Sequence, residues 1–201
     1  VPLFTTWTVW WNADRALHSC RGYWDAPIFH PTPDSFAFSE PMPTTLAVAP
    51  LIWLSGNRIL AHNIFLVLAL ALNGWAGFHL LRRVRVGRLA AVLGGGIIEL
   101  LPLVHHELGV LQLVPLCGIL WTIHSLHQLG VRPCTVRGAR LGAAFAFTYL
   151  TCAYYGLFLS VLLILGAGWL LGRQVMAKRT WTAISVAGAV SFVLLFPVVA
   201  A

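Results

Sequence analysis

The strongest constraint on the fold is a predominantly apolar run at residues 58–81, which Arg82, Arg83 and Arg85 follow directly. At about 1.5 Å per residue, a helix over this run would be roughly 36 Å long, enough to cross a hydrocarbon core of about 30 Å with some tilt. Of the 201 residues, 59% are apolar and 9% are charged, whereas soluble domains carry about 25% charged residues. Because a helix satisfies its own backbone in lipid, we predict an all-α polytopic transmembrane helix bundle.

Further apolar segments extend the predicted bundle. We expect a partial span at 43–56 and full spans at 89–104, 108–128 and 180–200, with Gly94 to Gly96 acting as a packing or kink element. A single helix over 141–171 would be about 46 Å long, which exceeds the hydrocarbon core. We therefore predict a hairpin of two shorter helices there, turning near Tyr154, Tyr155 and Gly156.

The net charge of +7 is concentrated in three short clusters between apolar runs. Ten of the thirteen basic residues form them: Arg82, Arg83, Arg85 and Arg88; Arg132, Arg137 and Arg140; Arg173, Lys178 and Arg179. Short basic loops between spans are typical of the cytoplasmic side of a membrane protein. This pattern argues against nucleic acid as a partner and predicts the lipid bilayer instead.

The acidic residues lie on the other predicted side. Four of the six acids, Asp14, Asp25, Asp34 and Glu40, fall in the loop-like stretch 12–42. The topology also brings Arg58, the segment 105–107 and the hairpin turn to this extracytoplasmic face. We divide the chain into residues 1–42, an extracytoplasmic loop carrying short interfacial helices, and residues 43–201, the bundle. The tryptophans at 7, 10 and 11 indicate an interfacial helix or, equally, a helix that packs on its neighbours.

Three acids are candidate catalytic residues: Asp14, Asp25 and Glu40. A carboxylate at a membrane surface can act as a general base, hold a divalent metal or pair with an arginine. Asp34, within a Pro-Thr-Pro-Asp-Ser segment, is more typical of a turn. Glu99 lies inside an apolar run, where a carboxyl has either a functional role or a structural role as a hydrogen-bonding group.

Other polar groups are candidates for substrate contacts at the same face. His105 and His106, followed by Glu107, would lie at the start of a span and bind an anion or a metal, or simply complete a helix turn. Tyr154 and Tyr155 are either interface anchors or substrate contacts. His79 and His124 lie at similar depths on two spans, which leaves haem ligation as a further alternative.

Several motifs, taken in order, resemble a known family. They are Trp11-Asn12-Ala13-Asp14-Arg15, Asp25-Ala26-Pro27-Ile28-Phe29-His30-Pro31, Phe38-Ser39-Glu40, Ala61-His62-Asn63, Leu81-Arg82-Arg83, His106, and Cys152-Ala153-Tyr154-Tyr155-Gly156-Leu157-Phe158. Over nearly the whole chain this resembles the front half of large bacterial multi-pass membrane proteins related to GT-C glycosyltransferases. That class includes protein mannosyltransferases, oligosaccharyltransferases and lipid A aminoarabinose transferases.

The resemblance implies a polyprenyl-phosphate sugar donor and a catalytic acid in the first extracytoplasmic loop of a bacterial inner-membrane protein. Asp14 is the nearest match to that acid, followed by Asp25 and Glu40. The acid would activate an acceptor hydroxyl or hold a metal that does so. Arg15, Arg58, His105, His106, Tyr154 and Tyr155 would contact donor or substrate. We expect Asp14, Glu40 and His106 to face one cleft.

The chain also departs from that family. Such proteins carry a membrane helix before this loop, often followed by a Gly-Asp pair, and continue well beyond the equivalent of residue 201. The chain begins Val-Pro without Met, so we expect a fragment or a processed chain. The alternative function is a non-catalytic structural or accessory subunit of a multi-subunit membrane complex.

Overall fold

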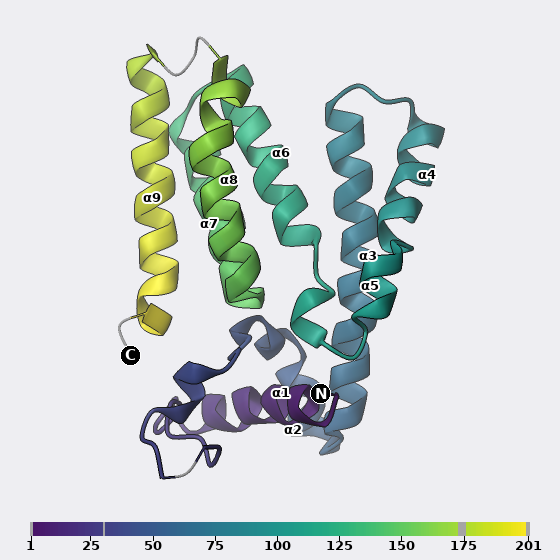
Figure 1. The fold of residues 1–201 in the computed structure, drawn as a ribbon, viewed down its shortest axis with the longest axis vertical. Coiled ribbons are helices and arrows are strands. Elements are labelled where there is room, and N and C mark those ends of the chain that lie inside the picture. Colours follow the sequence, from purple (N-terminus) through teal and green to yellow (C-terminus); the bar gives the residue numbers. More distant parts are fainter. Residues whose placement is uncertain (1, 30, 173–175, 200–201) are drawn as a thin grey trace.

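The computed structural model describes residues 2–29, 31–172 and 176–199 of the chain. Helices and irregular segments make up these ranges, and no strand occurs in them, so the prediction of an all-helical chain is confirmed for this part. Figure 1 shows long helices side by side, with one short helix lying across their lower end. His30 and Arg173, named above, lie outside the described residues.

The long helices run up and down between two ends of the molecule (Figure 1). In chain order they are α3 (Arg58–Arg83), α4 (Arg88–Glu99) with its short continuation α5 (Pro102–His106), α6 (Cys117–Val131), α7 (Thr135–Thr151), α8 (Ala153–Leu171) and α9 (Lys178–Val199). Within the described part of the chain, three segments are long and apolar enough to cross a membrane: Arg58–Arg83, Arg88–His106 and Lys178–Val198.

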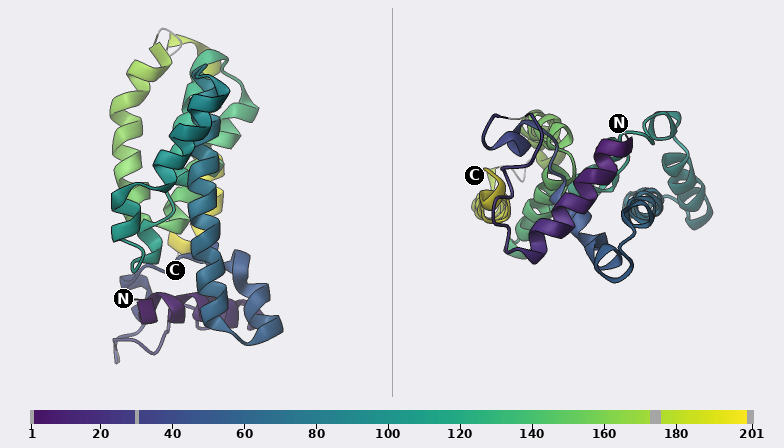
Figure 2. Two further views of the ribbon diagram at one scale, coloured as in Figure 1. Left: turned by 90° about the vertical axis from the view of Figure 1, so that its right-hand side faces the viewer. Right: turned by 90° about the horizontal axis from the view of Figure 1, so that it is seen from below.

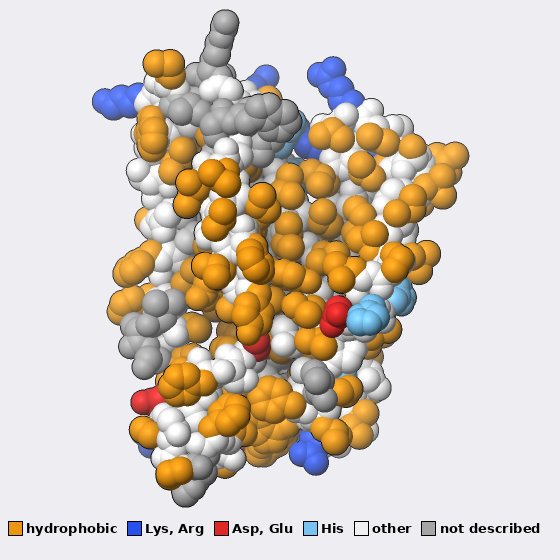
Figure 3. Space-filling model, viewed as in Figure 1, with side chains coloured by type: hydrophobic (Ala, Val, Ile, Leu, Met, Phe, Trp, Pro, Cys, Tyr) orange, Lys and Arg blue, Asp and Glu red, His pale blue; other side chains and the backbone are white. Residues whose placement is uncertain are grey.

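Large apolar side chains cover the outside of these helices, as Figure 3 shows over most of the visible face. On α4 alone, Leu89, Leu93 and Ile97 are 74%, 61% and 65% exposed. Exposed apolar area on this scale is unfavourable in water. It is the expected outer surface of helices solvated by lipid.

Glycines allow two helix pairs to approach closely. A Cβ built on Gly95 of α4 would lie 2.6 Å from the carbonyl oxygen of Gly74 on α3, and one on Gly138 of α7 would collide with the carbonyl of Ala183 on α9. Small residues at such crossings are how membrane helices gain van der Waals contact. Gly95, with Gly94 against Leu81, therefore acts as a packing element between α3 and α4.

The predicted span 108–128 is wrong in its first half. Apart from the short 3₁₀ helix η3 (Leu111–Leu113), residues 107–116 are irregular, and α6 begins only at Cys117. Pro115 favours an interruption here, because it has no N–H to donate to the carbonyl oxygen four residues earlier. Asn73 of α3 satisfies the broken backbone: its Oδ1 accepts from the N–H groups of Leu116 (2.7 Å) and Cys117 (2.9 Å).

The segment predicted as a hairpin at 141–171 corresponds to α7 and α8, which run in opposite directions (Figure 1). The helix breaks at Cys152, whose backbone is extended, rather than at the predicted Tyr154-Tyr155-Gly156. Gly156 instead lies against Tyr149, where a Cβ would be 2.8 Å from the Tyr149 Cα. Its small size lets the two arms meet directly after the turn.

Helix α1 (Pro2–Leu17) crosses the lower end of the bundle, as the view from below in Figure 2 shows. The chain then passes through two 3₁₀ helices, η1 (Ser35–Phe38) and η2 (Pro43–Val48), into α2 (Ala49–Ser55). Val9 and Ala13 of α1 are buried in one core with residues of η2, α2 and α3. Thr5 Oγ1 lies 3.2 Å from His62 Nε2 in a buried contact with α3.

The glycine contact between α3 and α4 generates a prediction with an adjacent control. Gly95→Ala should destabilise the protein by about 1–3 kcal/mol, because the new methyl collides with backbone that cannot rotate away. Gly96 has open space at its Cβ position, so Gly96→Ala should be neutral or stabilising by up to about 1 kcal/mol through helix propensity. Thermal unfolding in detergent, followed by circular dichroism, measures both. Equal melting temperatures for the two variants would contradict the contact.

Candidate functional site

The charged side chains separate between the two ends of the molecule. Figure 3 shows most Lys and Arg side chains at the upper end and the visible acidic side chains in the lower half. The turns 84–87 and 132–134 lie at the upper end, and α1 with its following loop lies at the lower end (Figure 1). The lower end therefore holds the candidate acids.

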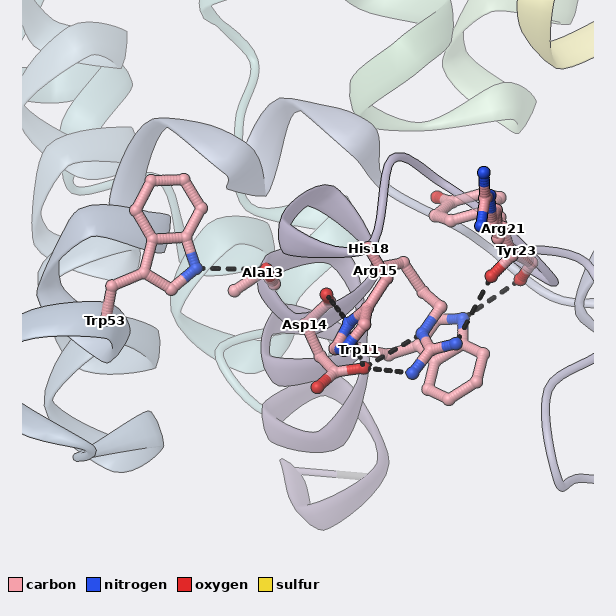
Figure 4. Close-up of polar contacts among 8 residues, drawn as sticks. All are labelled: Trp11, Ala13, Asp14, Arg15, His18, Arg21, Tyr23 and Trp53. Carbon is pink, nitrogen blue, oxygen red and sulfur yellow. Dashed lines mark hydrogen bonds and ion pairs between the residues drawn. The ribbon is translucent and has the colours of Figure 1, made fainter.

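Asp14, the acid favoured by the resemblance, is neutralised by its neighbour. Its Oδ2 accepts hydrogen bonds from Arg15 Nε (2.9 Å) and from Arg15 Nη2. His18 Nδ1 lies 3.7 Å from the same oxygen, and Figure 4 shows these groups together on one face of α1. The Asp14 carboxylate therefore already has a cationic partner within the protein.

Arg15 also stabilises the fold of the loop. Its guanidinium lies 4.5 Å from the centre of the Trp11 ring, and Nη1 donates to the Arg21 carbonyl oxygen at 3.2 Å. Trp11 Nε1 donates to the Tyr23 carbonyl oxygen at 3.0 Å (Figure 4). An aromatic cluster built around buried Phe36 holds the loop against α1. Arg15 thus has a structural explanation that needs no substrate.

Asn12 is the residue that sequence reasoning missed. It is 2% exposed, and its Nδ2 donates to the carbonyl oxygens of Pro41 (2.7 Å) and Met42 (3.0 Å) and to Thr45 Oγ1 (2.8 Å). Its Oδ1 accepts from Tyr23 OH at 2.7 Å. These bonds fix the segment that directly follows Glu40. Only its position between tryptophans and a charged pair could have drawn attention to it.

Among the three candidate acids, Glu40 is half-buried and lacks a cationic partner in the described part of the chain, whereas Asp25 also lacks one there but is exposed. Across the described residues, no Lys, Arg or His nitrogen lies within 4.0 Å of its carboxylate. Its Oε2 accepts a 3.2 Å hydrogen bond from the N–H of Ala153, the first residue of α8. Burial raises the pKa of Glu40 above its ordinary value of 4.5, and the Ala153 hydrogen bond opposes that rise in part. Burial, with no cationic partner among the described residues to oppose it, therefore makes Glu40 more basic than a solvated carboxylate.

Two pockets meet at Glu40. We call the first, of about 200 Å³, the Tyr149 pocket; Trp24, Tyr149, Leu150 and Val198 are among the side chains that line it with Glu40. We call the second, of about 410 Å³, the Tyr154 pocket; it is lined by Phe4, Ala37, Phe38, Ser39, Glu40, Gln112 and Tyr154. The second is within the size range of small-molecule sites. The acid therefore has space beside it for a substrate.

The other predicted site residues lie outside both pockets. Asp25 is exposed and accepts from the backbone N–H of Asp34 at 3.1 Å, which is turn chemistry. Arg58 is exposed at the first residue of α3, and His105 is exposed in α5. His106, also exposed, places Nδ1 3.0 Å from Glu107 Oε1.

The two tyrosines have different environments. Tyr154 is 57% exposed and lines the Tyr154 pocket with Glu40. Tyr155 donates from its hydroxyl to the Leu113 carbonyl oxygen at 2.8 Å, and so connects α8 to the irregular segment before α6. Tyr154 is therefore available for a substrate contact, and Tyr155 has a structural partner.

The expected cleft of Asp14, Glu40 and His106 is not what forms at Glu40. Neither Asp14 nor His106 lines the two pockets that Glu40 borders. The structure instead brings Glu40 together with Tyr154 and Gln112, which lie 114 and 72 residues after it in the sequence. In the ranges described here, no group of three or more His, Cys, Asp or Glu side chains could hold a metal ion.

Comparison with known proteins finds no match: no family model, no curated protein and no solved structure corresponds to this chain.

The raised pKa of Glu40 predicts how stability depends on pH. The folded state holds this proton more tightly than the unfolded state does, so the free energy of unfolding falls as pH rises from about 4.5 through the raised pKa. Glu40→Gln removes this penalty, and its amide oxygen can still accept from Ala153. We therefore expect the variant to melt at a higher temperature than wild type at neutral pH, with the difference vanishing in acid.

Thermal unfolding in detergent across this pH range measures the difference. Asp34→Asn is the control, because it makes the same change of charge at an exposed residue of the same loop with φ of +51°, a conformation that Asn tolerates. A lower melting temperature for Glu40→Gln at neutral pH would show that the Glu40 carboxylate stabilises the fold.

Proposed function

We propose that this protein is a membrane glycosyltransferase, or part of one, that transfers a sugar from a polyprenyl-phosphate donor at the extracytoplasmic face. Its catalytic residue in this proposal is the carboxylate of Glu40. The supporting observation is the environment of Glu40: a half-buried carboxyl with no cationic partner among the described residues, between two pockets at the acidic end of the molecule. The basic clusters at the opposite end favour placing that end in the cytoplasm.

In this proposal Glu40 acts as a general base. Its carboxylate takes the proton from an acceptor hydroxyl, and the hydroxyl oxygen attacks the anomeric carbon of the donor sugar. The bond from that carbon to the phosphate oxygen breaks, and polyprenyl phosphate leaves with the electron pair. General-base catalysis contributes about 10²–10⁴-fold to such a step.

The lining of the pockets suits a lipid-linked sugar. Trp24 and Tyr154 present large apolar ring faces against which a sugar could pack, and Gln112 supplies an amide for hydroxyl groups. Leu150 and Val198 give the Tyr149 pocket an apolar wall for the first prenyl units. Arg58, at the start of α3, and His105 and His106, in α5, remain proposed contacts of the donor phosphate.

One observation favours the second candidate, a non-catalytic accessory subunit of a membrane complex. Asp14, the acid nearest to the family's catalytic position, forms an ion pair with Arg15. In that case Glu40 would serve as a cap for α8, whose first N–H groups otherwise lack acceptors.

Reconstitution in vesicles with a panel of polyprenyl-phosphate-linked sugars tests the proposal. Release of polyprenyl phosphate, detected by mass spectrometry, should fall by about 100-fold or more in Glu40→Gln. Asp34→Asn should retain wild-type activity. If Asp14→Asn abolished turnover and Glu40→Gln did not, the catalytic acid would be Asp14. Folded wild-type protein that turns over none of the donors would favour the accessory subunit.

A further inference from the structure

A second polar pocket lies at the opposite end of the molecule, between the C-terminal ends of α3 and α6. It has a volume of about 430 Å³ and is lined by Arg83, Val84, Arg85, His127 and Val131. Arg83 is the last residue of α3, and Val131 is the last residue of α6. We call it the Arg83 pocket.

The polar groups of this pocket lack protein partners. Arg83 Nε and His127 Nδ1 are both buried, and neither has a hydrogen-bond partner among the described residues. A buried donor without an acceptor costs about 1–3 kcal/mol. Arg83 Nε is a donor, and His127 Nδ1 is one when it carries the ring proton, so a ligand that accepts hydrogen bonds would satisfy both nitrogens.

The charge of the pocket also lacks compensation. All six acidic residues lie at positions 14, 25, 34, 40, 99 and 107, outside the turns that form this end. Arg83 is close enough to interact electrostatically with His124, as are His79 and His127. The C-terminal dipoles of α3 and α6 oppose an anion with about half a charge each, but Arg83 and Arg85 supply two full positive charges.

The backbone beside the pocket is held in an unusual conformation. Arg85 has φ of +66°, a region that non-glycine residues rarely occupy and that tends to persist at functional sites. Arg82 closes the same turn by donating from Nη1 to the Val86 carbonyl oxygen at 2.8 Å. The turn thus presents Arg85 beside Arg83 rather than extending α3.

We propose that the Arg83 pocket binds a phosphate group, which accepts hydrogen bonds from Arg83 and His127 and neutralises Arg83 and Arg85. The shape of the site favours the headgroup of an anionic phospholipid as the source. Val84 and Val131 are 50% and 51% exposed beside the charged groups. The pocket therefore combines the cationic side chains of Arg83 and Arg85 with exposed apolar side chains. Basic pockets between membrane helices bind anionic lipid headgroups in this manner. This inference does not rest on the proposed transferase activity.

Native mass spectrometry of the purified full chain with phosphatidylglycerol or phosphatidylcholine tests the proposal. Wild type should retain phosphatidylglycerol in preference, and Arg83→Gln should weaken that binding by about tenfold, the loss expected for a hydrogen bond to a charged group. The control is Arg179→Gln, an equal loss of charge at an exposed residue of the same end. It should change binding less than twofold.

A second arm separates the two sources of phosphate. Thermal stability is measured in lipid-free detergent with inorganic phosphate, and with chloride at equal ionic strength. Stabilisation by inorganic phosphate that Arg83→Gln abolishes would support a soluble anion, and Arg83-dependent lipid binding without it would support the headgroup. Equal behaviour of Arg83→Gln and Arg179→Gln in both arms would overturn the proposal. If Arg83→Gln fails to fold, the exposed Arg85→Gln replaces it.

Discussion

The lower end of this molecule depends on the hydrogen bonds of one buried side chain, Asn12. Its amide nitrogen donates to two carbonyl oxygens and a hydroxyl in the segment 41–45, and its amide oxygen accepts from Tyr23. Met42 is buried at φ of +48° directly before η2, and Asn12 supplies hydrogen bonds to the backbone carbonyls of this turn, which lies against an apolar core. Because Glu40 directly precedes this segment, the position of the candidate acid follows from Asn12.

Asn73 solves the same problem within the bundle. Helix α6 begins part-way along α3, and the side chain of Asn73 pairs with Val114, Leu116 and Cys117 where the helical ladder is interrupted. A break of this kind is tolerated at membrane depth only where protein groups replace the missing partners. The interruption leaves residues 107–116 beside the hairpin turn, where Gln112 and Tyr154 border the same pocket as Glu40. The space next to the acid therefore results from a broken helix.

The two ends of the bundle differ in how their charges are compensated. At the lower end Asp14 is paired with Arg15, whereas Glu40 is held by a backbone N–H alone among the described contacts and loses solvation through burial. At the upper end the cationic groups of the Arg83 pocket have no carboxylate in the neighbouring turns. Uncompensated charge is costly near lipid. Among the described residues, the lower end thus carries an acidic group without a cationic partner, Glu40, and the upper end carries basic groups without an acidic partner, Arg83 and Arg85.

The amino-acid sequence by itself determined the all-helical class, the apolar runs that form α3, α4 and α9, and the separation of basic and acidic residues, because each depends on composition and local periodicity. It also indicated that Gly94 to Gly96 form a packing or kink element, and the structure shows close contacts at Gly94 and Gly95. The sequence did not place the start of α6 at Cys117 or the helix break at Cys152. It also ranked Asp14 above Glu40 as a candidate catalytic residue. Only the tertiary structure showed how the surroundings of these two acids differ: Asp14 pairs with a neighbouring arginine on its own helix, whereas the pockets beside Glu40 are built from residues distant in sequence, Gln112, Tyr149 and Tyr154.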